Sequence, residues 1–215
     1  MFKKLVNGVY LAEERPCGCN VYLIAGNPPI LVDLREDDAD ELLNLAEAIV
    51  GRPRFLILTH CHYDHAGGAY IASKRGLKVA IGKGDEEVLS TGDGYRSCAF
   101  LFDRTLKPVN PSLILKGGSL LESKPYKLVV ISTPGHTPGS ICLYEPVKGW
   151  LFTGDTVFSD GIGRTDLPGG SLASLYSSIK KLAKLNVNSL LPGHGEPLVK
   201  GGKEALIEAL SILET

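Results

Sequence analysis

The sequence predicts an α/β protein whose chain divides into two strand-rich halves, each with helices on its outside. Short apolar runs recur in both halves and are separated by turns rich in Gly and Pro, as expected for strands. Residues 42–49 and 172–185 instead repeat their apolar side chains at helical spacing. With 215 residues and 44% hydrophobic content, the chain is long enough to bury a large core.

The first half is expected to alternate short strands with helices. The helix over residues 42–49 has Asp37 or Asp38 as its candidate cap. Residues 69–75 are expected to start a helix, and residues 84–89 to form a short one capped near Asp85. Residues 90–110 show no clear period and are predicted to form a loop wall over the site, with aromatic side chains that serve packing. The strands expected here are residues 5–11, 20–25, 30–33, 54–58 and 77–81.

The second half repeats this scheme. The helix over residues 172–185 is followed by a last strand before His194 and by an amphipathic helix over residues 203–213. The expected strands are residues 113–115, 127–131, 141–144 and 150–152. The two halves share too little sequence identity to indicate a repeat.

A histidine-rich segment follows the strand predicted at residues 54–58. His60 and His62 are two residues apart, so both imidazoles point to the same side of an extended chain. Asp64 and His65 fall in the turn that follows, where they can face a second ion. Three imidazoles and a carboxylate suit zinc, iron or manganese better than calcium or magnesium, which prefer oxygen ligands.

These four residues cannot complete two coordination spheres, so further ligands are needed at other strand ends. The two remaining histidines of the chain, His136 and His194, each follow an apolar run and a Pro-Gly pair. Asp155 ends another apolar run and offers a carboxylate in the same kind of place. Glycines beside these residues, such as Gly193, are predicted to permit tight turns or close backbone approach.

With these motifs, the chain resembles the metallo-β-lactamase superfamily and, within it, the glyoxalase II group. The resemblance implies a four-layer αββα sandwich formed by a single domain over residues 1–215, without the helical C-terminal domain of glyoxalase II. It also implies two metal ions bridged by Asp155, with zinc expected and iron or manganese as alternatives. It assigns the first metal to His60, His62 and His136 and the second to Asp64, His65 and His194.

The activity implied is hydrolysis of a hydroxyacyl thioester by a metal-bridging hydroxide, with Asp64 and Asp155 as catalytic residues. One alternative is an iron persulfide dioxygenase that uses His60, His136 and Asp155, and a less favoured one is an RNA-processing nuclease. An antibiotic-hydrolysing role is less expected, because Asp155 stands where some β-lactamase subclasses have cysteine and no secretory leader is evident. Arg164 is a candidate clamp for a substrate carboxylate, although pairing with Asp166 would also explain it.

The amino-acid composition indicates which classes of molecule the protein is expected to bind. The 23 basic and 24 acidic residues balance, so neither nucleic acid nor an anionic membrane is an expected partner. A small-molecule thioester in the cytoplasm is expected, and a homo-oligomer remains open. The five cysteines are odd in number and lack framework spacing, which predicts reduced thiols, and Cys17-Gly18-Cys19 alone is a weak redox or metal signal. Asp33 is predicted either to orient a ligand histidine or to cap a turn.

Overall fold

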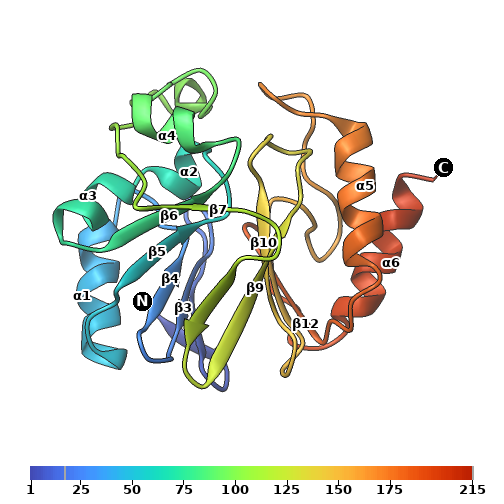
Figure 1. Cartoon of the computed structure of the whole chain (residues 1–215), viewed down its shortest axis with the longest axis horizontal. Coiled ribbons are helices and arrows are strands. Elements are labelled where there is room, and N and C mark those ends of the chain that lie inside the picture. The colour runs from blue at the N-terminus through green and yellow to red at the C-terminus, as the bar shows by residue number, and fades with distance from the viewer. Residues whose placement is uncertain (17, 215) are drawn as a thin grey trace.

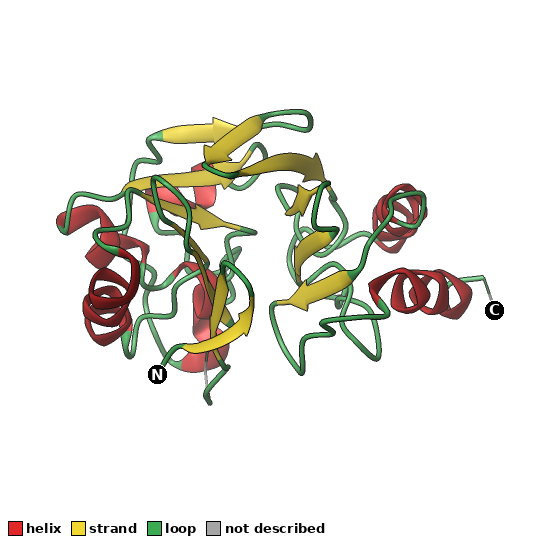
Figure 2. Cartoon of the chain, turned by 90° about the horizontal axis from the view of Figure 1, so that it is seen from below, coloured by secondary structure: helices red, strands yellow, loops and turns green. Residues whose placement is uncertain are grey.

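The computed structural model describes residues 1–16 and 18–214, and within them two β-sheets pack face to face between outer helices. Figure 1 shows α1 and α3 on one side and α5 and α6 on the other, and Figure 2 shows the strands between the two helical layers. The predicted αββα sandwich is therefore confirmed. The helices are α1 (Ala39–Val50), α2 (Tyr63–Ala66), α3 (Ala69–Lys74), α4 (Glu86–Thr91), the 3-10 helix η1 (Ala99–Phe102), α5 (Leu172–Leu182) and α6 (Gly202–Ile212).

The first sheet has the strand order β1-β2-β3-β4-β5-β6-β7. Its strands are antiparallel from β1 to β4 and parallel from β4 to β7. They are β1 (Lys3–Val6), β2 (Val9–Ala12), β3 (Val21–Ile24), β4 (Ile30–Val32), β5 (Phe55–Leu58), β6 (Lys78–Gly82) and β7 (Leu113–Leu115).

The second sheet has the order β12-β11-β10-β9-β8, with only β11 and β12 parallel within it. Its strands are β8 (Leu120–Ser123), β9 (Tyr126–Ser132), β10 (Ile141–Glu145), β11 (Trp150–Gly154) and β12 (Ser189–Pro192).

Alternation along the strands builds the layers. In β5, Ile57 faces the core between the sheets, whereas Leu56 and Leu58 pack against the α1 and α3 layer. In β11, Phe152 faces the same central core and Leu151 packs under α5 and α6. Both faces of these strands are therefore buried, which explains their nearly continuous apolar sequences.

The strand predicted over residues 5–11 and the cap predicted for α1 need correction, and one strand was missed. The strand predicted over residues 5–11 is a hairpin of β1 and β2, because Asn7-Gly8 forms a two-residue turn in which Gly8 has φ +93°. The strand β8 was not predicted. Asp38 occupies the N-cap position of α1 without capping it, since its carboxylate instead binds the buried Arg35 through Nε at 2.8 Å and Nη2 at 2.9 Å.

Candidate metal centre

The polar residues singled out in the sequence gather where strands of both sheets end. β5 leads into His60 and His62, and β9 leads into the loop that carries His136. β11 ends immediately before Asp155, and β12 ends two residues before His194. Asp64 and His65 lie in α2, which begins directly after His62 and not in an irregular turn. The fold thereby brings all seven predicted ligand residues to one edge of the sandwich.

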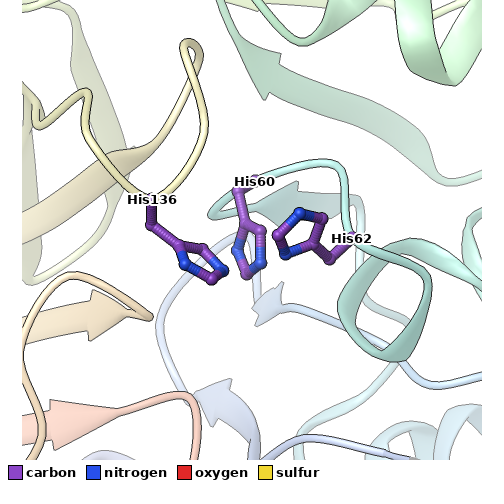
Figure 3. A group of neighbouring side chains, drawn as sticks. All are labelled: His60, His62 and His136. Carbon is purple, nitrogen blue, oxygen red and sulfur yellow. The ribbon is translucent and has the colours of Figure 1, made fainter. Parts of the chain in front are cut away.

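His60, His62 and His136 form the first group. Each offers a ring nitrogen within 4.8 Å of the others, and Figure 3 shows the three rings turned toward one another. Their three Nε2 atoms are buried and have no hydrogen-bond partner among residues 1–16 and 18–214. Burial lowers the pKa of His62 to about 3 and that of His60 well below its usual value, so both rings present free lone pairs. Unpartnered buried nitrogens that converge in this way fit a metal ion.

Asp64, His65 and His194 form the second group, again with ligand atoms within 4.8 Å of one another. His194 Nε2 lies 3.0 Å from Asp64 Oδ2 and 3.2 Å from His65 Nε2. Two Nε2 atoms that face each other at this distance both point at one position. One carboxylate and two imidazoles there suit zinc or iron.

Asp155 lies between the two groups. Its Oδ1 is 3.2 Å from His65 Nε2, and its Oδ2 is 3.5 Å from His136 Nε2 and 3.7 Å from His194 Nε2. Burial opposes ionisation of Asp155, but the neighbouring His65 holds the pKa of its carboxyl well below the usual range. The ionised carboxylate thus contacts a histidine of each group, and the whole cluster fits a two-metal site.

Outer hydrogen bonds fix the orientation of four of these rings. In each case Nδ1 contacts a protein oxygen, which leaves Nε2 for the centre. The Nδ1 partners are Thr59 Oγ1 for His60 at 3.1 Å, Asp33 Oδ2 for His65 at 2.8 Å, Arg164 O for His136 at 2.8 Å and Glu14 Oε2 for His194 at 2.7 Å.

Asp33 orients a ligand histidine, His65, which was one of the two roles predicted for it. It also accepts hydrogen bonds from Thr59 N at 2.7 Å and from Thr59 Oγ1 at 2.8 Å, so it joins the end of β5 to His65. The hydroxyl of Thr153, at the end of β11, donates a hydrogen bond to the backbone Val157 O at 2.7 Å and does not orient a ligand. A Cβ on Gly193 would overlap Asp155 Oδ1, so glycine is required there for close approach.

Two carboxylates near the centre escaped the sequence analysis. Glu14 holds His194 and also accepts from Gly195 N at 3.2 Å. Asp85, expected as a helix cap, makes no cap bond. Its carboxylate instead accepts from Cys61 N, Thr137 Oγ1 and Gly139 N at 2.7 to 2.9 Å. It therefore ties the loop of His60 and His62 to the loop of His136.

Arg164 pairs with Asp166, with Nε to Oδ1 at 3.0 Å and Nη2 to Oδ2 at 2.7 Å, and its exposed side chain also borders the cavity over the centre. Cys61 Sγ contacts Arg96 O at 3.8 Å, in keeping with a side chain directed away from the ligands. Cys17 lies outside the described residues, whereas Cys19, Cys61, Cys98 and Cys142 are free and buried.

Fold and site together define a metal-binding αββα protein with a centre at the strand ends. The family model of the metallo-beta-lactamase superfamily matches residues 15–194, and the chain belongs to this superfamily. Within the described part of the chain, no helix has the length and apolar content of a membrane span.

Similar proteins include a probable metallo-hydrolase of Methanocaldococcus jannaschii, which is 37% identical over 82% of this chain and 87% of its own length. The acyl-coenzyme A thioesterase MBLAC2 of Homo sapiens is 33% identical over 66% of this chain and 56% of its own, so the match spans little more than half of that relative.

Solved structures with the same fold include the BLEG-1 B3 metallo-beta-lactamase, with a TM-score of 0.82, 26% identity and 100% of both chains covered. TTHA1623 in a di-iron-bound form gives a TM-score of 0.76 and 30% identity over 89% of this chain and 94% of that one.

Proposed function

We propose that this protein is a hydrolase with two metal ions that cleaves the thioester of an acylated thiol. The observation that carries the proposal is the pair of ligand groups that share Asp155. The acyl-coenzyme A thioesterase relative supports the choice of a thioester. The glyoxalase II resemblance favours a hydroxyacyl group, whereas the thioesterase relative leaves the acyl group open.

His60, His62 and His136 would hold one ion and Asp64, His65 and His194 the other, with Asp155 shared. When bound, two such cations would polarise the acyl carbonyl and lower the pKa of a water molecule toward about 7. The donor set favours zinc, and iron also fits it. In the reaction, the water oxygen attacks the acyl carbon and the carbon–sulfur bond breaks.

We assign to Asp64 the role of accepting the proton of the attacking water. Its carboxylate borders the cavity over the centre and accepts from His194 Nε2 at 3.0 Å. Burial raises the pKa of Asp64, but His65 and the hydrogen bond from His194 more than offset this, so the pKa is lowered and the group stays ionised. The departing thiolate belongs to a thiol with a pKa of about 8.5, so it leaves readily near neutral pH.

The test of this function is metal content followed by turnover. Protein purified without added metal or chelator should hold about two equivalents of zinc or iron per chain. The reconstituted protein should then hydrolyse acyl thioesters, followed as release of free thiol. One equivalent of iron, no thioester cleavage and oxygen uptake with glutathione persulfide would replace the hydrolase with the dioxygenase that uses His60, His136 and Asp155.

Removing the Glu14 carboxylate should weaken the second metal position. Glu14→Ala deletes the acceptor of His194 Nδ1 at 2.7 Å, so the ring is no longer held with Nε2 toward Asp64. Losing an outer carboxylate of this kind costs roughly 10- to 100-fold in metal affinity. Competition with a chelator should show one of the two equivalents released more easily.

Glu13→Ala is the matched control, because among the described residues the neighbouring Glu13 carboxylate pairs only with Lys3, at 3.1 Å, and both side chains are largely exposed. Glu14→Gln, which keeps an oxygen acceptor without the charge, should fall between the two variants. Equal affinity for both equivalents in Glu14→Ala and Glu13→Ala would contradict the role given to Glu14.

A further inference from the structure

A cavity of about 260 Å³ opens directly above the ligand side chains. His62, His136 and Asp155 border it on the side of the centre. Any group bound in this cavity therefore lies against the atoms at which the proposed reaction takes place. The chemistry of its remaining walls decides which part of a thioester fits there.

The walls are apolar and come from both halves of the chain. Leu101 and Phe102 belong to η1, and Phe158 and Leu167 belong to the loop between β11 and α5. Leu101 is 53% exposed and the other three are partly buried, so the free protein presents a wetted apolar surface at its reaction centre. Covering such a surface with an apolar ligand is favourable.

Polar groups on these walls are few. Apart from the ligand side chains, the polar residues described around the cavity are Cys98 and Arg164. Arg164 is already engaged in two hydrogen bonds to Asp166, and its side chain is 61% exposed. Burial raises the pKa of Cys98 to about 11, so this thiol stays neutral and is a weak hydrogen-bond partner. A hydroxyl on the acyl group gains little from these walls.

From this lining we infer that the cavity is the acyl subsite and that it selects an unsubstituted apolar acyl chain over a hydroxyacyl group. The inference rests on the proposed thioesterase function. Each methylene buried against Leu101, Phe102, Phe158 and Leu167 should raise kcat/KM roughly four-fold until the cavity is filled.

The test uses the metal-loaded full chain and thioesters that share one small thiol, N-acetylcysteamine. The acyl groups are acetyl, butyryl and hexanoyl for chain length, and isobutyryl and lactoyl for the effect of a hydroxyl. We expect kcat/KM to rise roughly four-fold per methylene from acetyl to hexanoyl. Isobutyryl should exceed lactoyl by roughly 10-fold or more, since the two differ by a methyl in place of the 2-hydroxyl. A flat series, or lactoyl as the best substrate, would overturn the inference.

Leu101→Asn tests the wall itself, because Leu101 is half exposed and its replacement leaves the core intact. The matched control is Phe100→Asn, because Phe100 also belongs to η1 and is also 53% exposed. Its ring stacks on Tyr95, with the ring centroids 5.9 Å apart, and does not border the cavity. Leu101→Asn should reduce the gain per methylene, and Phe100→Asn should keep the wild-type gain. Equal gains in both variants would overturn the inference.

Binding measurements with unreactive ligands test the acyl subsite independently of the hydrolysis reaction. Non-hydrolysable S-alkyl thioethers of the same thiol, titrated by calorimetry, should bind roughly four-fold more tightly per methylene. Thioethers that follow this trend without any thioester turnover would refute the hydrolase and support the apolar subsite. Turnover that responds to the length of the thiol carrier, but not to the acyl length, would assign the cavity to the carrier and overturn the inference.

Discussion

The Asp155→Ala variant is expected to lose both metal ions on purification and at least about 10³-fold in kcat/KM, because bound cations supply several kcal/mol of transition-state stabilisation. Asp155 contacts His65 through Oδ1 and both His136 and His194 through Oδ2. Without this carboxylate, Asp64 would be the one carboxylate left among the predicted ligands to offset the charge of two dications. Elemental analysis of the purified variant and thioester turnover at matched protein concentration provide the measurement.

The control for this substitution is Asp160→Ala, which changes an exposed aspartate of the same loop. It should keep two equivalents of metal. The free energy of unfolding of the metal-free proteins shows whether the substitution affects folding or only metal binding. In the metal-free protein Asp155 Oδ1 lies 3.2 Å from the buried His65 Nε2, so the substitution removes an ion pair and should destabilise this fold without abolishing it. Full activity in Asp155→Ala would disprove the shared ligand, whereas metal loss with a collapsed metal-free fold would make Asp155 a folding residue.

Local sequence patterns were sufficient to predict much of the fold and the set of candidate ligands. His60 and His62 lie just beyond β5, and their two-residue spacing was enough to predict that their ring nitrogens meet, although residues 59–62 are not part of the strand. The apolar runs of β4, β11 and β12 are buried on both faces, and polar residues immediately after such runs mark strand ends. Sequence patterns of this kind locate a strand-end site without a tertiary model.

The outer carboxylates could not be found in this way. Glu14 lies 180 positions from its partner His194, and nothing in its neighbourhood distinguishes it from Glu13. Asp85 precedes a helix, where aspartate is the ordinary cap, and its three partners lie on two other loops. In both cases the function depends on long-range contacts, whereas the local signal fits a surface or cap residue equally well.

The errors in the predicted strands have local causes. The Asn7-Gly8 pair was a hairpin signal within a run whose alternation continues across the turn. β8 is a short edge strand of Leu, Glu and Ser, without β-branched or aromatic residues, and it forms only because it pairs with β9. Pairing with β9 therefore stabilises β8 as a strand, although the intrinsic β-propensity of its residues does not predict one.

Asp85→Ala should be among the most destabilising single substitutions away from the ligands themselves. The carboxylate is fully buried and accepts from Cys61 N at 2.9 Å, Thr137 Oγ1 at 2.7 Å and Gly139 N at 2.7 Å. Its removal leaves two buried backbone N–H groups without an acceptor, which should lower the free energy of unfolding by about 3 kcal/mol. Urea unfolding of the metal-free protein measures this loss.

The same substitution should also weaken the first metal position, because Asp85 fixes the spacing between the loop of His62 and the loop of His136. Asp37→Ala is the control, since the exposed Asp37 pairs with Arg104 at 3.5 Å and with no other side chain in the described part of the protein. It should change the free energy of unfolding by no more than about 0.5 kcal/mol. Asp85→Asn keeps one acceptor oxygen and should recover part of both effects. If Asp85→Ala lowers stability but binds the first equivalent of metal as tightly as wild type, then the two loops are positioned by the strands alone.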